Sequence, residues 1–184
     1  MTAAQWMTLE PSAEAAMYQR ILVPFDGSST SALALDEAIG LARSCGASIR
    51  LVHVIDDLVM ANGFETFAAY REDVVPRVKR AAEAVLAAGR ERLDCSGVSF
   101  DAALVDEVGA RVADLILQQA TVWNADLIVA GTHGRRGFER WVVGSEAEHL
   151  VRRAEVPVLL VRSRPGNEAA PGEVLVPQAR SHAA

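Results

Sequence analysis

The sequence predicts an α/β protein with a single doubly wound domain, in which helices cover both faces of a parallel sheet. Short apolar runs of strand length alternate along the chain with longer segments of helical period. Several of these runs are continuously apolar, which is typical of parallel strands buried on both faces. The length of 184 residues suits one domain. Crossovers between parallel strands are right-handed, so few topologies remain.

Strands are expected where short runs rich in apolar and β-branched residues stop at turn-forming residues. In chain order these runs are 20–25, 48–55, 98–104, 126–130 and 157–161. The first ends at Asp26-Gly27, a typical strand-to-turn boundary.

Helices are expected over 29–45, about 70–93, 106–123 and 145–154. Gly46 fits the C-cap of the first helix. Pro76 either kinks the second helix or marks its true start. In the third helix, helical spacing places several apolar residues on one face, namely Val108, Val112, Leu115, Ile116 and Val122.

The two ends of the chain differ from the segment between them. Residues 1–19 lack a strong period and are expected to form an N-terminal extension, and residues 164–184, which contain Pro and Gly, a flexible C-terminal tail. The compact domain is expected over 20–163. The N-terminus lacks the basic and apolar regions of a signal peptide, and no apolar run is long enough to span a bilayer. A cytoplasmic protein with no membrane contact is therefore expected.

Composition excludes several kinds of chemistry. Of the 18 Lys and Arg residues, only Lys79 is a lysine, and it follows no glycine-rich stretch, so a P-loop is excluded. The net charge of −6 argues against a nucleic-acid partner. Cys45 and Cys95 form no metal-binding or redox motif, so reduced thiols are expected.

Residues that follow strands are the candidates for a binding site, because ligands of doubly wound sheets bind beyond the carboxyl ends of strands. Asp26 follows the first strand. A glycine-rich stretch, 131–137, follows the fourth, and it leads to Gly144-Ser145 at the start of a helix. Backbone N–H groups of such a loop form an anion nest, to which a helix N-terminus adds a positive dipole end. With the basic residues Arg135, Arg136 and Arg140, this combination suits a di- or triphosphate.

Structural roles compete with these functional ones. Ser145 and Glu148 fit a capping box, in which the serine caps the helix and the glutamate reaches back. Asp26 either braces the first turn, accepts ribose hydroxyls or helps to hold a divalent cation on the phosphates. His133 is expected to be a loop residue rather than a base, because nothing near it in sequence would orient its ring.

The glycine spacing also carries a family resemblance. Gly131, Gly134, Gly144 and Ser145 match the G-x2-G-x9-G-[ST] motif of the ATP-binding subgroup of universal stress proteins. The sequence from Ala125 to Arg162 resembles the C-terminal half of that family. The segment Ile21–Arg43 resembles its first strand, loop and helix, and Leu51–Asp56 resembles its second strand. The resemblance covers about 20–163.

The resemblance implies a five-stranded parallel sheet in the order 3-2-1-4-5 and a binding site for ATP, or ADP or AMP, with Mg. It implies that Asp26 contacts the ribose, that Pro24 helps to line the adenine, and that the backbone at Val54 faces the adenine. It also implies that Gly131 and Gly134 approach ribose and phosphates. Other expected cofactor-binding residues are Arg135, Gly144 and Ser145; Asp26 is the expected metal ligand, and no residue is expected to be catalytic. A homodimer through the last strand, Pro157–Arg162, is also implied, which would cover an otherwise unpaired apolar edge.

The leading functional hypothesis is an ATP-binding regulatory dimer of the stress response. An enzyme, either a weak ATPase or an autophosphorylating phosphotransferase, is the alternative; phosphoryl transfer needs a positioned nucleophile, and no residue clearly supplies one, so at most slow hydrolysis is expected. A scaffold with a structural nucleotide is a third possibility, and flavin binding a minor one.

Overall fold

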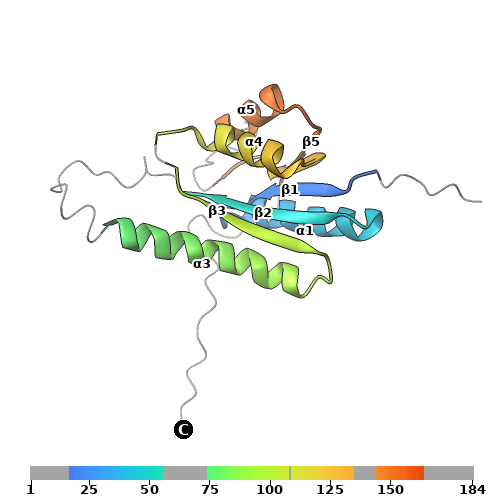
Figure 1. Cartoon of the computed structure of the whole chain (residues 1–184), viewed down its shortest axis with the longest axis horizontal. Coiled ribbons are helices and arrows are strands. Elements are labelled where there is room, and N and C mark those ends of the chain that lie inside the picture. Colours follow the sequence, from blue (N-terminus) through green and yellow to red (C-terminus); the bar gives the residue numbers. More distant parts are fainter. Residues whose placement is uncertain (1–16, 56–73, 108, 135–143, 164–184) are drawn as a thin grey trace, which may run out of the picture.

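The computed structural model describes residues 17–55, 74–107, 109–134 and 144–163. Most of the expected N-terminal extension, the C-terminal tail, Val108, Arg135 and the connection 56–73 lie outside this part. Within it the chain forms one five-stranded sheet with the order β3-β2-β1-β4-β5, and all four strand pairs are parallel. Figure 1 shows helices on both sides of this sheet, so the predicted fold class is confirmed.

The strands lie close to the expected runs: β1 (Arg20–Pro24), β2 (Ser48–Val54), β3 (Phe100–Val105), β4 (Leu127–Gly131) and β5 (Val158–Val161). Alternate side chains of a strand point to opposite faces. The three central strands, β2, β1 and β4, therefore contribute side chains to two hydrophobic cores, one on each face of the sheet. Ile21, Val23, Ile49, Leu51, Leu127 and Val129 face one core. Leu22, Val52, Val54, Ile128 and Ala130 face the other. The continuously apolar runs are therefore explained by burial on both faces.

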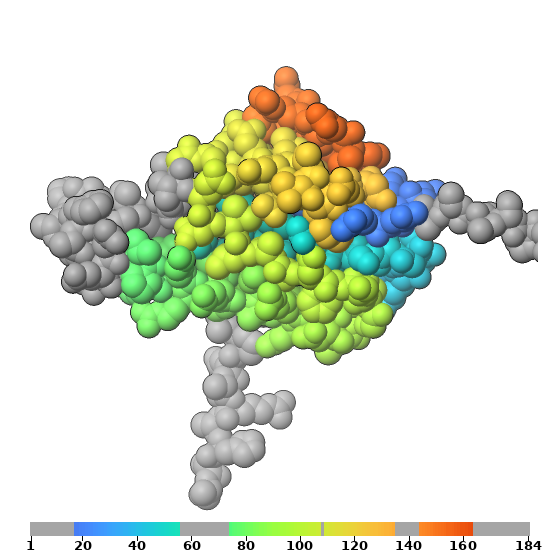
Figure 2. All heavy atoms as spheres, in the orientation of Figure 1, coloured from blue at the N-terminus to red at the C-terminus, as the bar shows by residue number. Residues whose placement is uncertain are grey.

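The helices of the described residues divide between the two faces in pairs. On the first core lie α1 (Ser29–Cys45) and α3 (Val75–Asp94), and on the second α4 (Val112–Trp123) and α5 (Ser145–Arg153) (Figure 1). In the space-filling view, α3, β3, α4 and α5 cover the central strands so closely that little of β2 can be seen (Figure 2). None of the helices in the described ranges is long and apolar enough to cross a membrane.

Helix ends follow local chemistry. The Ser28 hydroxyl accepts from Ser31 N at the start of α1, and Gly46 ends α1 with a φ of 69°, in the left-handed region that favours glycine. Pro76 lies in the first turn of α3, where its missing N–H costs no helical hydrogen bond. Of the two alternatives for Pro76, the helix start is the one observed.

Two expectations for the third predicted helix are wrong. The helix α4 begins at Val112 rather than at 106, because Gly109 has a φ of 85° that no α-helix contains. Val122 does not lie on the buried face: 68% of its surface is exposed. In the last turn of α4 the adjacent Trp123 is buried instead, and its large ring covers the end of the core.

Trp123 lies under two guanidinium groups at the amino ends of the strands. Arg20 Cζ is 4.8 Å and Arg50 Cζ 5.2 Å from the centre of the indole ring. Arg50 also pairs with Asp101 on the neighbouring strand β3, with Nε 2.7 Å from Oδ1. This cluster stabilises the end of the sheet opposite to the loops that follow β1 and β4.

Candidate functional site

The strand order reverses between β1 and β4, which lie side by side in the middle of the sheet. The chain leaves β1 for α1 and β2 on one side, and leaves β4 for α5 and β5 on the other. The loops after these two strands therefore diverge and leave a crevice, which is where ligands of doubly wound folds bind. Of the residues expected to bind a ligand, Asp26 and Gly134 come from these loops and Ser145 from the first turn of α5, whereas Pro24, Val54 and Gly131 end strands β1, β2 and β4.

Asp26 and Gly134 are brought together across this crevice. Ser28 donates to Asp26 Oδ1 from both its N–H, at 3.0 Å, and its hydroxyl, at 2.6 Å. These bonds fix the carboxylate, whose second oxygen is directed at the other loop: a Cβ added to Gly134 would lie 2.7 Å from Oδ2. Any residue larger than glycine at 134 would therefore displace the carboxylate. Asp26 does brace its own turn, and it also places an oxygen beside the glycine-rich loop.

Gly131 at the end of β4 packs directly on the first turn of α1. A Cβ at this position would lie 2.9 Å from the carbonyl carbon of Thr30 and 3.1 Å from the backbone nitrogen of Ser31. The Thr30 side chain is buried, and its hydroxyl donates to the carbonyl oxygen of His133. The glycine-rich loop is thus attached to α1 by close backbone packing and by one side-chain hydrogen bond.

Thr132 and His133 connect the loop to its surroundings. Thr132 N donates to Val161 O, and Thr132 O accepts from Gly144 N, both at 2.9 Å. Thr132 Oγ1 lies 3.1 Å from His133 Nδ1, so a neighbouring residue does orient this ring, contrary to the sequence argument. Nε2 of His133 is buried and has no hydrogen-bond partner in the ranges that the structure describes.

The capping box expected at Ser145 and Glu148 is wrong. Gly144 is the N-cap of α5, no side chain caps this helix, and Ser145 is its first helical residue. Glu148 points along the helix to Arg152, with Oε1 2.9 Å from Nη2. The predicted motif is one residue out of phase, because Gly144 rather than Ser145 occupies the capping position.

The acidic side chain next to Ser145 serves another helix. Glu146 Oε2 accepts from Ala113 N at 2.8 Å, at the start of α4, and its Oε1 accepts from Arg111 Nε at 3.1 Å. Arg111 Nη2 also donates to the carbonyl oxygen of Ser145 at 3.2 Å. The negative charge of Glu146 is therefore paired with a cation and a helix N-terminus, which reduces its repulsion of an anion at the N-terminus of α5.

A second ionic contact joins the same two helices one turn further on. His149 Nε2 donates to Asp114 Oδ1 at 2.8 Å, and this hydrogen bond lowers the pKa of Asp114 from its ordinary value. The sequence did not indicate that Arg111 and Asp114 hold α5 against α4. Nothing in their spacing indicates the role, since it depends on how α4 and α5 pack.

The two residues expected at the adenine lie on adjacent strands, at the carboxyl end of the sheet. Pro24 ends β1 and pairs with Val52, so Val54 continues β2 beyond it and pairs with Val105 of β3. His53 Nδ1 donates to Phe25 O at 2.7 Å and joins the two strands there. Arg135, Arg136 and Arg140 lie outside the described residues.

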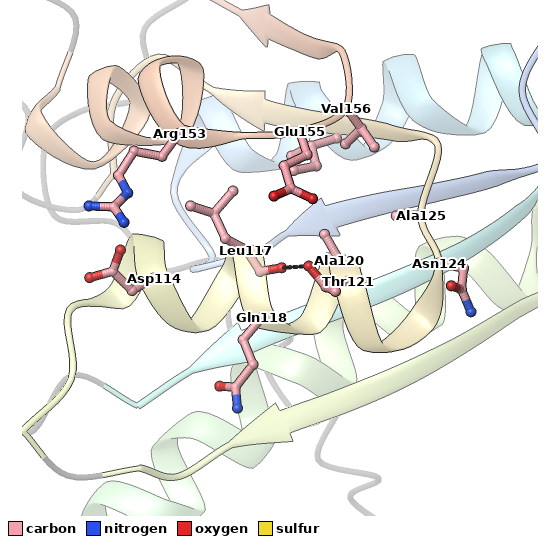
Figure 3. Close-up of a pocket in the computed structure, with 11 residues that line it drawn as sticks. Asp114, Leu117, Gln118, Ala120, Thr121, Asn124, Ala125, Arg153, Glu155 and Val156 are labelled. Atoms are coloured by element: carbon pink, nitrogen blue, oxygen red, sulfur yellow. Dashed lines mark hydrogen bonds between the residues drawn. The ribbon is translucent and has the colours of Figure 1, made fainter.

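The described residues hold no group of three or more His, Cys, Asp or Glu side chains that could bind a metal ion. They do form a groove of about 600 Å³ elsewhere, between α4 and the α5–β5 connection. Figure 3 shows Leu117 and Ala120 in this groove, with Asp114, Arg153 and Glu155 around it. Asn124 and Ala125 place its far part near the start of β4, away from the glycine-rich loop.

The architecture and the loops together define a doubly wound α/β protein with a glycine-rich loop at the reversal of its strand order. The chain belongs to the universal stress protein family, whose model matches residues 17–162. A Staphylococcus epidermidis protein that bears the universal stress protein name is 32% identical over 164 residues, which cover 89% of this chain and 95% of that protein.

Solved structures of this family share the fold. A universal stress protein family member from Burkholderia pseudomallei is 34% identical, with a TM-score of 0.64, over 80% of this chain and 98% of that one. A universal stress protein from Archaeoglobus fulgidus in complex with dAMP is 23% identical, with a TM-score of 0.56, over 78% of this chain and 98% of that one. A further structure, of a universal stress protein in complex with cAMP, is 23% identical, with a TM-score of 0.55, over 79% of this chain and 97% of that one.

Proposed function

We propose that this protein binds ATP at the crevice between the β1 and β4 loops and acts as a regulatory nucleotide-binding dimer of the stress response. The observation that carries the proposal is the contact between Asp26 and Gly134, since it combines a fixed carboxylate with a backbone that has no side chain in the way. A carboxylate accepts hydrogen bonds from ribose hydroxyls, and exposed N–H groups of a glycine-rich loop bind phosphates.

Each residue has a proposed role that follows from its position. Asp26 accepts the ribose hydroxyls. Pro24 lines the adenine at the end of β1, and the backbone of Val54 faces it at the end of β2. Gly131 and Gly134 let the ribose and phosphates approach the backbone. The terminal phosphates lie at the first turn of α5, which begins at Ser145 after the N-cap Gly144 and whose first N–H groups have no partner within the helix. Arg135, which follows Gly134 in the chain, adds positive charge.

A bound Mg²⁺ is part of this proposal. Mg²⁺ in nucleotide sites commonly takes one or two carboxylates and completes its shell with phosphate oxygens and water. Asp26 supplies such a carboxylate beside the glycine-rich loop. The ion would lower the repulsion between the phosphates, and the residues named above would still bind and orient the nucleotide.

The relatives with bound dAMP and cAMP favour an adenine nucleotide over other phosphates. The triphosphate is proposed because the first turn of α5 extends the anion-binding surface beyond the loop that would meet the first phosphate. A regulatory role fits a site made of binding groups. A dimer through β5 fits the edge position of that strand and the 37% exposure of Leu159.

The test is the nucleotide content of the purified protein together with calorimetric titration of ATP, ADP and AMP with and without Mg²⁺. Asp26→Ala should weaken ATP binding by roughly tenfold or more, because hydrogen bonds to a charged acceptor are lost. Asp36→Ala is the matched control, since Asp36 is an exposed carboxylate on α1 that pairs with Arg92. If wild-type protein contains no adenine nucleotide and binds none at millimolar concentration, the proposal is wrong.

A further inference from the structure

The hydrogen bond between Thr30 and the glycine-rich loop has a consequence for the direction of one backbone N–H group. Thr30 lies in the first turn of α1 with 7% of its surface exposed, and its hydroxyl donates to the carbonyl oxygen of His133. A carbonyl oxygen only accepts, so the proton on this bond belongs to Thr30. The bond therefore holds the His133 carbonyl towards α1.

The carbonyl of His133 and the N–H of Gly134 belong to one peptide group. This group is planar, and it is trans because the chain has no cis peptide among the described residues. The N–H of a trans peptide points opposite to its carbonyl. Because Thr30 holds the carbonyl towards α1, the Gly134 N–H must point away from α1. No backbone carbonyl in the described ranges accepts this N–H.

The neighbouring hydroxyl does not compete for the same position. Ser28 Oγ lies 3.2 Å from Thr30 Oγ1 but donates to Asp26 Oδ1 at 2.6 Å and accepts from Ser31 N at 3.2 Å. Ser28 has one hydroxyl proton, and the shorter bond to a charged acceptor takes it. Asp26 and the His133 carbonyl are thus held by separate hydroxyl groups.

We propose that Thr30 is a positioning residue for phosphate binding: it fixes the orientation of the His133–Gly134 peptide and so presents the Gly134 N–H to a phosphate of the nucleotide. This inference rests on the proposed function and adds to it a residue outside the glycine-rich motif. Without the hydroxyl, the peptide of a glycine can rotate at little cost, because glycine adopts most backbone conformations. The N–H would then be presented for only part of the time.

The proposal predicts different effects on the binding of the phosphates and of the ribose. Thr30 acts on the phosphate contact, whereas the ribose contact depends on Asp26, which Ser28 holds independently. Thr30→Val replaces the hydroxyl by a methyl group at nearly constant volume and should weaken ATP binding by roughly three- to tenfold, the usual effect of one hydrogen bond. Adenosine, which has no phosphate, should bind as it does to the wild type, and Thr30→Ser should restore ATP binding.

The experiment measures ATP and adenosine affinities of the full chain by calorimetry, with the melting temperature of each ligand-free variant. Thr121→Val is the control, because Thr121 is an exposed threonine whose hydroxyl donates to Leu117 O within α4. If Thr30→Val does not fold, Thr30→Ala takes its place. Wild-type affinity for ATP in the variant, an equal loss for ATP and adenosine, or failure of Thr30→Ser to restore binding each overturns the inference. Absence of ATP binding by the wild type overturns the proposed function, and this inference with it.

Discussion

Glu146 caps a helix other than its own. Its Oε2 lies 2.8 Å from Ala113 N, at the start of α4, although Glu146 is the second residue of α5. The first turn of α5, where the phosphates are proposed to bind, is therefore fixed in place by the N-terminus of α4. Arg111 strengthens this connection, since it contacts both Glu146 and the carbonyl of Ser145.

Glu146→Ala should lower the free energy of unfolding by about 1 kcal/mol, the usual cost of removing a helix N-cap. Urea denaturation followed by circular dichroism measures this change. Glu148→Ala is the matched control on the same helix, because it removes only an exposed pair with Arg152 and should change stability by less than about 0.5 kcal/mol. Equal effects of the two substitutions would show that the contact with Ala113 contributes nothing.

Two helical glycines should respond to alanine with opposite signs. A Cβ at Gly89 of α3 would lie 2.6 Å from Leu51 Cδ2 and 3.1 Å from the Phe25 ring, whereas a Cβ at Gly40 of α1 would meet nothing within 4 Å. Gly89→Ala should destabilise the protein by about 1–3 kcal/mol through overpacking. Gly40→Ala should stabilise it by about 0.5–1 kcal/mol through helix propensity.

The melting temperatures of these two variants give the test, since both substitutions add the same methyl group. A rise in melting temperature for Gly89→Ala would mean that α3 does not approach the sheet as closely as the structure shows. A fall for Gly40→Ala would mean that this turn of α1 packs against a part of the chain outside the described residues.

The ion pair between Asp114 and His149 should make stability depend on acid pH. The hydrogen bond from His149 lowers the pKa of Asp114 in the folded protein below its ordinary value of 3.8. A carboxyl group whose folded pKa is depressed contributes stability above its unfolded pKa, and this contribution is lost as the pH falls through the folded pKa. Stability should therefore fall more steeply below pH 3.8 in the wild type than in Asp114→Asn.

His149→Gln should flatten the same part of the pH profile, because it removes the group that stabilises the carboxylate. The double variant should then behave like either single variant, since both substitutions remove one interaction. Denaturation midpoints of the wild type and the three variants, measured between pH 2.5 and pH 6, test this prediction. Additive effects would indicate that the two side chains act through different neighbours.

The proposed dimer requires an apolar contact at the edge strand β5. Leu159 is a partly exposed apolar residue on β5, the edge strand next to β4. Leu159→Arg should weaken dimer association by roughly tenfold or more, because it places a charge in an interface that excludes water. Analytical ultracentrifugation gives the dissociation constant.

Val122→Arg is the control for this experiment, since Val122 is an exposed apolar residue on α4 rather than on the edge strand. It should leave the association unchanged. A wild-type protein that sediments as a monomer at all concentrations would refute the dimer, and equal weakening by both substitutions would place the interface elsewhere.

The arrangement of strands and helices could be predicted because local patterns agree with the global fold. Gly46, for example, has both the position and the positive φ that end a helix, and Pro76 stands where a helix can begin. The sequence predicts too early a start for α4, because the apolar period continues backwards through Gly109, whose backbone conformation overrides it.

The candidate site could be predicted less completely, since part of it depends on contacts between distant segments. The glycine spacing pointed to Gly131, Gly134 and Gly144, and the structure shows what each of them approaches. The roles of Thr30 and Glu146 follow from packing between α1, β4, α4 and α5, and no spacing along the chain encodes them. The serine–glutamate pattern at α5 is misleading because the helix begins one residue earlier than the motif implies, with Gly144 as its N-cap.

The position of Trp123 determines how the protein can be followed by fluorescence. Its buried indole lies under Arg20 and Arg50 at the amino ends of the strands, whereas the proposed ligand lies at the carboxyl ends. Its emission should therefore report unfolding and stay constant when nucleotide binds. Trp141 lies in the sequence between Gly134 and Gly144. A variant that keeps Trp123 and replaces the other two tryptophans, Trp6 and Trp141, by phenylalanine would thus report unfolding by a fluorescence signal that does not change when the nucleotide binds.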